Sequence, residues 1–149
     1  MAGMPAASSV DVVALASRLR LDVMRLARKL RREGDVDVTP TLLSALSTID
    51  RHGPMTAGAL AAHEQVRKPT VTRLIGALVD RGLIERQPDP ADGRVSWVRV
   101  SRDGVKFLRR IRRRTDEYLA KRMTQLSVQE LAILERASGI MERLTEDDR

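Results

Sequence analysis

The sequence predicts a mainly α-helical fold of the α+β class, in which several helices surround one small β-hairpin. Two observations carry this prediction. Apolar residues recur every three to four positions along most of the 149 residues, as they do in amphipathic helices. Strand-like alternation of apolar and polar residues is confined to one short stretch that ends at Val100. With 42% hydrophobic residues, a chain of this length is expected to form one folded domain.

The first predicted helix runs from Val10 to about Arg32 and stops at Gly34. It follows residues 1–9, which are small and polar and are expected to form a flexible arm. Its apolar residues form two interleaved series with seven-residue spacing, the pattern of a helix that packs against another helix. The two series are Val12, Leu19 and Leu26, and Ala16, Val23 and Leu30.

Three shorter helices are predicted next. Thr39 and Pro40 form an N-cap and first-turn pair for a helix that ends before Gly53. An alanine-rich helix over 56–63, a tight turn over 64–66 and a helix that closes at Gly82 then form a helix-turn-helix. The predicted buried positions are Leu42, Leu43, Leu46 and Ile49 in the first of these helices, and Val71, Leu74, Ala77 and Leu78 in the last.

A β-hairpin with a long exposed tip follows directly. Residues 83–86 and 94–100 have strand patterns, with Ser96, Val98 and Val100 on one side, and residues 88–93 are dense in turn formers. A helix-turn-helix followed by such a hairpin is the winged helix-turn-helix arrangement.

Two helices are predicted after the hairpin. Ser101 caps the first, and Ser127 with Glu130 forms a capping box for the second. Because neither apolar stripe has a sheet to cover it, the first and last helices of the chain are expected to pack together and onto another subunit. This predicts an intertwined dimerisation region of residues 10–36 and 101–149 around a winged helix-turn-helix domain of residues 37–100. The stripes are Leu108, Ile111, Thr115, Tyr118, Met123 and Leu126, and Leu131, Leu134, Ala137, Met141 and Leu144.

Composition narrows the function. The formal net charge of +7 favours a polyanionic partner. Since only Trp97, Phe107 and Tyr118 are aromatic, double-stranded DNA is favoured over single strands, which are bound by stacking. Most of the positive excess lies in the run Arg109–Arg114. We interpret this run as a solvated face partly neutralised by Glu130, Glu135 and Glu142, the alternative being non-specific attraction to the DNA backbone.

Several classes of site are excluded or disfavoured. Cysteine is absent, and His52 and His63 are expected to be surface or helix-end residues, so no metal site or cofactor is predicted. The chain has no phosphate-binding glycine cluster, nucleophile elbow or isolated carboxylate pair, and it is therefore not expected to be an enzyme. No secretory signal is expected from residues 1–10, and no apolar run approaches the roughly 18 residues that cross a bilayer. A cytoplasmic protein without membrane contact is expected.

Three stretches together resemble the MarR family of winged-helix transcriptional regulators: VTPTLLSAL, GPMTAGALAAHEQVRKPTVTRLIGALVDRGLIER and DPADGRVSWVRVSRDG. The resemblance implies a homodimer that places each helix-turn-helix in a major groove and each wing in the flanking minor groove. It also implies repression that ends when a small, often aromatic or phenolic, effector binds. We therefore expect a sequence-specific regulator that recognises a pseudo-palindromic operator in double-stranded DNA. The alternatives are a winged-helix adaptor that binds proteins only, and a metal-sensing regulator, which the absence of cysteine disfavours.

The resemblance also suggests the DNA-binding residues of the reading helix. Its exposed members are expected to be Arg67, Lys68, Thr70, Thr72 and Arg73, and Pro69 matches relatives with proline at that place. An arginine beside a helix N-terminus is unfavourable unless a phosphate lies between them, so Arg67 is predicted to contact the DNA backbone, the alternative being a solvated turn residue. Arg73 is a candidate for either guanine or phosphate, and the two threonines are ambiguous readers.

In the wing, Asp92 and Arg94 match the acidic and basic pair of the family. Arg94 is expected to enter the minor groove, the alternative being a solvated hairpin charge. Asp92 is expected to orient an arginine. Gly93 replaces a residue that is often basic, and Trp97 stands where relatives usually have an aliphatic residue and is expected to pack.

Overall fold

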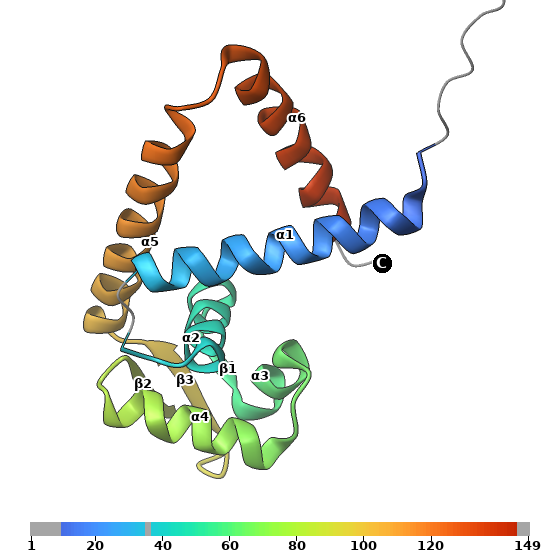
Figure 1. Cartoon of the computed structure of the whole chain (residues 1–149). Coiled ribbons are helices and arrows are strands. Elements are labelled where there is room, and N and C mark those ends of the chain that lie inside the picture. The colour runs from blue at the N-terminus through green and yellow to red at the C-terminus, as the bar shows by residue number, and fades with distance from the viewer. Residues whose placement is uncertain (1–9, 35–36, 146–149) are drawn as a thin grey trace, which may run out of the picture.

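The computed structural model describes residues 10–34 and 37–145 and confirms the mainly α-helical fold with a small sheet (Figure 1). The expected arm at residues 1–9 lies outside the described residues, as do residues 35–36 of the link after the first helix. In chain order the elements are α1 (Val12–Glu33), α2 (Pro40–His52), β1 (Met55–Thr56), α3 (Ala57–Glu64), α4 (Lys68–Asp80), β2 (Ile84–Pro88), β3 (Ser96–Val100), α5 (Arg102–Met123) and α6 (Val128–Thr145).

The predicted helix caps are confirmed. The Thr39 hydroxyl accepts a hydrogen bond from the Leu42 N–H at 3.3 Å, and the Ser101 hydroxyl accepts one from the Gly104 N–H at 2.9 Å. At the start of α6, the Glu130 carboxylate accepts from the Ser127 N–H at 2.8 Å, while the Ser127 hydroxyl accepts from the Glu130 N–H at 3.2 Å. Helix α1 begins later than predicted because Asp11 is its N-cap.

The sheet has three antiparallel strands in the order β1-β3-β2. Strand β1 was not predicted, since two residues are too few to show an alternating pattern. The predicted first strand of the hairpin, residues 83–86, is shifted: β2 ends at Pro88, which pairs with Ser96. Pro88 is tolerated because β2 is an edge strand, where a missing N–H breaks no ladder bond. The second hairpin strand starts at Ser96 and not at residue 94.

One core holds α2, α3, α4, the sheet and the base of α5 together. Leu46, Leu60 and Leu78 are completely buried in it. The predicted face of α4 is confirmed at Val71 and Leu78, while Ile75, which was not predicted, is also buried and Leu74 and Ala77 pack at its edge. The hairpin and α4 are therefore fixed to the same core. Its buried members are Leu42, Ala45, Leu46, Ile49, Met55, Leu60, Val71, Ile75, Leu78, Leu83, Ile84, Val98 and Leu108.

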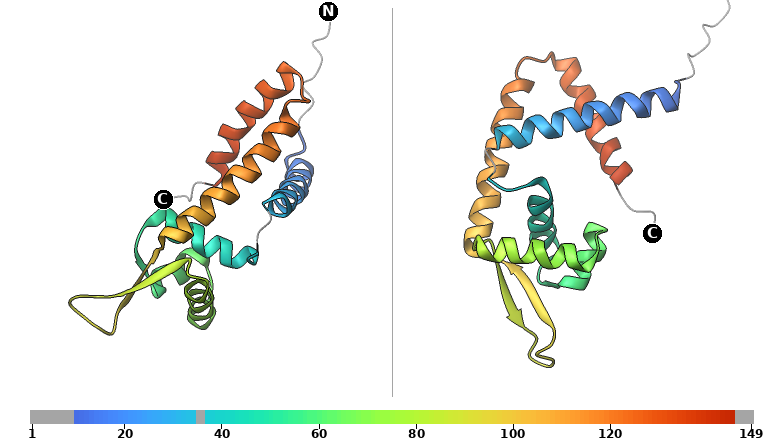
Figure 2. Two further views of the ribbon diagram at one scale, coloured as in Figure 1. Left: turned by 90° about the vertical axis from the view of Figure 1, so that its left-hand side faces the viewer. Right: turned by 60° about the horizontal axis from the view of Figure 1, so that its bottom comes forward.

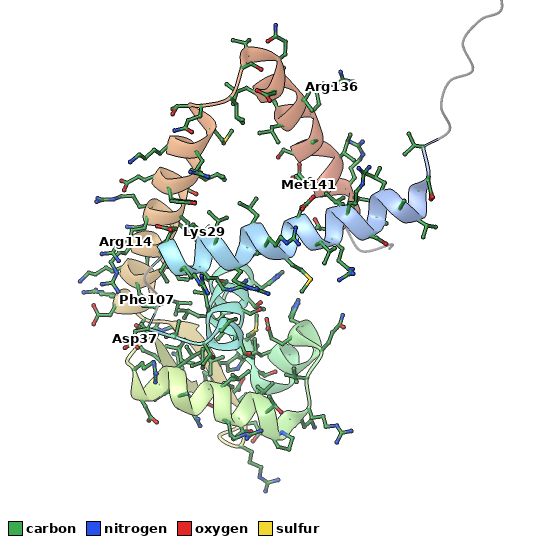
Figure 3. All side chains as sticks on the ribbon, in the orientation of Figure 1. Lys29, Asp37, Phe107, Arg114, Arg136 and Met141 are labelled. Atoms are coloured by element: carbon green, nitrogen blue, oxygen red, sulfur yellow. The ribbon has the colours of Figure 1, made fainter. Side chains whose placement is uncertain are left out.

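The terminal helices lie outside this core. Helix α5 extends away from it, and α6 turns back from the far end of α5 and diverges from it, so that α1, α5 and α6 outline a triangle (Figure 1), which Figure 2 shows from two other directions. Within the chain α1 packs on α5, where Lys29, labelled in Figure 3, lies over the ring of Tyr118. The expected packing of the first and last helices together and onto another subunit stays a prediction. Neither α1 nor α6 contains a buried residue, so their apolar stripes are uncovered in the described chain. None of the helices within residues 10–34 and 37–145 is long and apolar enough to span a bilayer.

Two arginines of the run on α5 have ion-pair partners other than the glutamates predicted for the run. Arg112 forms an ion pair with Asp50 of α2 at 2.7 Å, and Arg113 forms one with Glu117 at 3.1 Å. Glu130, which was expected to neutralise the run, is instead engaged in the capping box of α6. The reason is helical geometry, because Glu117 lies one turn from Arg113 on the same helix face.

Candidate nucleic-acid interface

The first turns of α4 present a cationic face to solvent. Val71 and Ile75 point into the core, and Arg67, Lys68 and Arg73 are exposed. Pro69 lies in the first turn, as predicted, and is exposed as well. Leu74, which was predicted to lie on the buried face of this helix, packs against the core, and so does Val66 in the preceding turn.

Both threonines were expected to be exposed, and only Thr72 is. Thr70 is half-buried, since it precedes the buried Val71 by one position, or about 100° around the helix. Thr72 is exposed, and its hydroxyl donates to the Lys68 carbonyl oxygen at 3.1 Å, which leaves this hydroxyl its lone pairs as acceptors. Thr72 also lines a small cavity of about 70 Å³ between α4 and the hairpin, together with Arg86 and Ser96.

The N-terminus of α4 is not capped by a side chain. Arg67 occupies the N-cap position, and its side chain makes no capping hydrogen bond. Its carbonyl oxygen accepts from the N–H groups of Thr70 and Val71, at 2.9 and 3.2 Å. Two exposed cations, Arg67 and Lys68, therefore flank the positive end of a helix dipole, which is an arrangement that favours an anion.

The turn before α4 starts from helix α3, which is joined to α2 by side-chain contacts. Glu64 belongs to α3, so the turn covers residues 65–67 and not 64–66 as predicted, and Gln65 adopts a left-handed conformation with φ of 52°. The Thr48 hydroxyl donates to Glu64 at 2.6 Å and joins α2 to α3. His52 and His63 are exposed at the ends of these helices, as expected, and their rings stack with centroids 4.4 Å apart.

The wing, meaning β2, β3 and the loop of residues 89–95 between them, projects beyond α4 (Figure 2). At its base Arg99 pairs with Glu85 at 2.9 Å. In its loop Asp92 accepts a hydrogen bond from the main-chain N–H of Arg94 at 3.0 Å. Asp92 was expected to orient an arginine, and it does contact Arg94, but through the main-chain N–H and not through the guanidinium. Aspartate side chains are short and commonly accept a hydrogen bond from the backbone N–H two residues further on. Arg94 is exposed at the loop.

The loop is organised by a residue that the sequence did not single out. The Asp89 carboxylate accepts hydrogen bonds from the Trp97 indole N–H at 2.7 Å and from the N–H groups of Ala91 and Asp92 at 2.8 and 3.1 Å. The indole, followed by the two amides, lowers the pKa of Asp89 below its usual value, since each donor stabilises the charged form. Trp97 thus has a polar role besides the packing that was expected of it.

Arg86 was also missed by the sequence reasoning. It lies on β2 opposite Val98, is exposed, and lines the small cavity beside Thr72. The usable signal was its place in a hairpin strand that directly follows the reading helix. Arg86 therefore adds a further positive charge to the wing, on the side where the hairpin faces Thr72 of α4.

Comparison with known proteins identifies the fold and the family. The MarR family model matches residues 38–96. The chain is 44% identical over 134 residues to an HTH-type transcriptional regulator of Mycobacterium bovis named Mb0904, covering 89% of this chain and 94% of that protein. A crystal structure of a protein from Pseudomonas aeruginosa, described as a candidate transcriptional regulator, is 34% identical with a TM-score of 0.83, covering 91% and 96% of the two chains.

A further structure shares the fold at lower identity. A point mutant of S. aureus MepR, solved bound to an oligodeoxyribonucleotide, is 21% identical with a TM-score of 0.68 and covers 89% of this chain and 98% of that chain. The uncapped cationic helix, the projecting wing and these similarities lead to one conclusion: the chain belongs to the MarR family of DNA-binding transcriptional regulators.

Proposed function

We propose that the chain acts as a homodimeric repressor that binds a pseudo-palindromic operator in double-stranded DNA. The proposal rests on one observation: two exposed cationic elements are anchored in the same hydrophobic core. The first turns of α4 and the wing with Arg94 are both fixed to a single core. A helix and a hairpin fixed in this way suit a major groove and the adjacent minor groove. A regulator of transcription must meet the genome, so the proposal includes a cytoplasmic location.

Within this proposal the residues of α4 have distinct roles. Arg67 and Lys68 bind a backbone phosphate at the uncapped helix N-terminus, which Pro69 helps to shape. Arg73 contacts a guanine edge or a second phosphate, and Thr72 offers an acceptor toward the groove. Thr70, at the border of the buried face, contacts the DNA with the part of its side chain that is exposed. In the wing, Arg94 enters the minor groove, while Asp92 acts through the main chain of Arg94.

The apolar stripes of α1 and α6 support the homodimer. They carry exposed large side chains that include Leu19, Leu26, Leu134 and Leu144, and contiguous apolar surface of this kind is typical of an interface. A two-fold dimer presents two copies of α4 and predicts a two-fold symmetric operator. A small aromatic or phenolic effector that releases the DNA is included on the family resemblance. The proposal assigns the chain no catalytic role.

The wing assignment is tested with Arg94→Ala. A duplex is first selected from a random DNA pool with the wild-type protein, and affinities for it are then measured by mobility shift at two salt concentrations. Arg94→Ala is expected to weaken binding about tenfold, because an arginine contact in a groove is lost. Wild type is expected to lose affinity steeply with salt, by a log-log slope of about −0.9 for each phosphate neutralised.

The matched control is Arg136→Ala, which removes the same side chain from α6, away from the wing (Figure 3). Equal affinities of the two variants would reject the wing assignment. If wild type enriches no sequence and gives no shift even at low salt, the adaptor function would be favoured instead.

A further inference from the structure

Two carboxylates accept hydrogen bonds in the wing loop of residues 89–95: that of Asp92 accepts one, from the Arg94 N–H, and that of Asp89 accepts the most. Asp89 accepts three hydrogen bonds, one of them from Trp97 on β3, eight residues along the chain. The Asp89 N–H in turn donates to the Val95 carbonyl oxygen, and the Val95 N–H donates to that of Asp92, both at 2.9 Å. We call Asp89, Trp97 and the amides of Ala91 and Asp92 the wing clasp. The clasp joins the two ends of the loop that carries Arg94.

The loop would be mobile without such a closure. Gly93 has no neighbouring atom that would meet a Cβ within 4 Å, so packing does not restrain the tip. The residues around it are exposed, and exposed loop residues have many accessible conformations. Ordering a side chain and its loop on binding lowers affinity, and a loop that is already ordered avoids this loss.

We propose that Asp89 and Trp97 are positioning residues for DNA binding, which hold the wing loop in the conformation that directs Arg94 into the minor groove. This inference rests on the proposed role of Arg94. Neither residue needs to touch the DNA, since both act through the main chain of residues 89–95. The indole N–H is the part of Trp97 that matters, because an aliphatic residue, which the resemblance leads one to expect at this position, has no donor for the carboxylate.

The contribution of the Trp97 indole N–H can be separated from that of its aromatic ring by substitution. Trp97 is half-buried and lies opposite Gln87 on β2, so a phenylalanine keeps an aromatic ring there and removes only the donor. Trp97→Phe is expected to weaken binding to the selected duplex about fivefold, the scale of one net hydrogen bond. Asp89→Asn replaces one of the two acceptor oxygens by an NH₂ group, which cannot accept a hydrogen bond, and is expected to have a similar effect. Gln87→Ala is the control, since it alters the same hairpin outside the clasp.

The experiment measures two quantities for each variant. The first is the affinity for the selected duplex, with Arg94 present and in the Arg94→Ala background. The second is the rate at which trypsin cuts the native protein after Arg94, without DNA, which reports opening of the loop. Trp97→Phe and Asp89→Asn are expected to raise this rate about fivefold as the same hydrogen bond is lost. They are expected to weaken DNA binding only where Arg94 is present.

The outcomes separate the role of the wing clasp from the role of Arg94. If both variants bind DNA as tightly as wild type, or if they weaken binding equally with and without Arg94, the clasp does not position Arg94. If Arg94→Ala alone weakens binding while the clasp variants do not, the clasp is rejected and the wing assignment stands. If Arg94→Ala has no effect, both roles are rejected. Faster cleavage with unchanged affinity also rejects the positioning role.

Discussion

Leu134→Glu is expected to leave the protein monomeric at micromolar concentrations and to weaken its binding to the selected duplex about 100-fold or more. Leu134 is 41% exposed in the single chain and lines an apolar groove along α6 together with Met123, Val128 and Leu131. If a second chain covers this groove, the substitution buries an unpaired carboxylate, which costs several kcal/mol. A dimer contacts two linked half-sites of the operator, whereas a monomer contacts only one and therefore binds DNA more weakly. Sedimentation measures the mass, and mobility shift measures the affinity.

Gln129→Glu is the matched control for this variant. It makes the same change of charge on the same helix, at an exposed position outside the apolar stripe. It is expected to remain dimeric and to bind DNA as wild type does. A dimeric Leu134→Glu protein would show that α6 is not part of the interface.

Gly104→Ala is expected to lower the free energy of unfolding by about 3 kcal/mol, at the upper end of the usual effect of overpacking. Gly104 lies in the first turn of α5, where a Cβ would overlap the carbonyl oxygen of Leu83 and lie 2.7 Å from Cγ1 of Val100. The Leu83 carbonyl has little freedom to move, since it accepts the Ser101 N–H at 3.0 Å. The added methyl therefore forces α5 away from the sheet. Urea unfolding at a fixed protein concentration measures the change.

Gly76→Ala provides the comparison, because it makes the same substitution in the middle of α4. A Cβ there meets no atom within 4 Å. Alanine favours helix by about 0.5 to 1 kcal/mol over glycine, so this variant is expected to be slightly more stable than wild type. Equal stabilities of the two variants would contradict the close contact between α5 and the sheet.

The helices and three of their N-terminal caps could be predicted from the sequence because the interactions that set them are local. Thr39, Ser101 and the pair Ser127 and Glu130 each act within three residues of their partners. The hairpin was also predictable in outline. Strand β1 was not, since its two residues form a strand only by pairing with β3, which lies far along the chain.

The candidate site was predictable to the same extent. The exposure of Arg67, Lys68, Arg73 and Arg94 follows from helix periodicity and turn composition. The contact of Trp97 with Asp89 does not, because it depends on how far β2 and β3 pair before the loop begins. For the same reason the partner of Arg112 could not be predicted, since Asp50 reaches it only after α2 and α5 pack together.

In the proposed complex two chains bind one duplex, each with its α4 and its wing. The mass of the complex with the selected duplex, read together with the symmetry of the enriched sequence, tests it most directly. We expect two chains per duplex and an inverted repeat whose half-site centres lie about 10 base pairs apart. One chain per duplex, or an enriched sequence without two-fold symmetry, would contradict it.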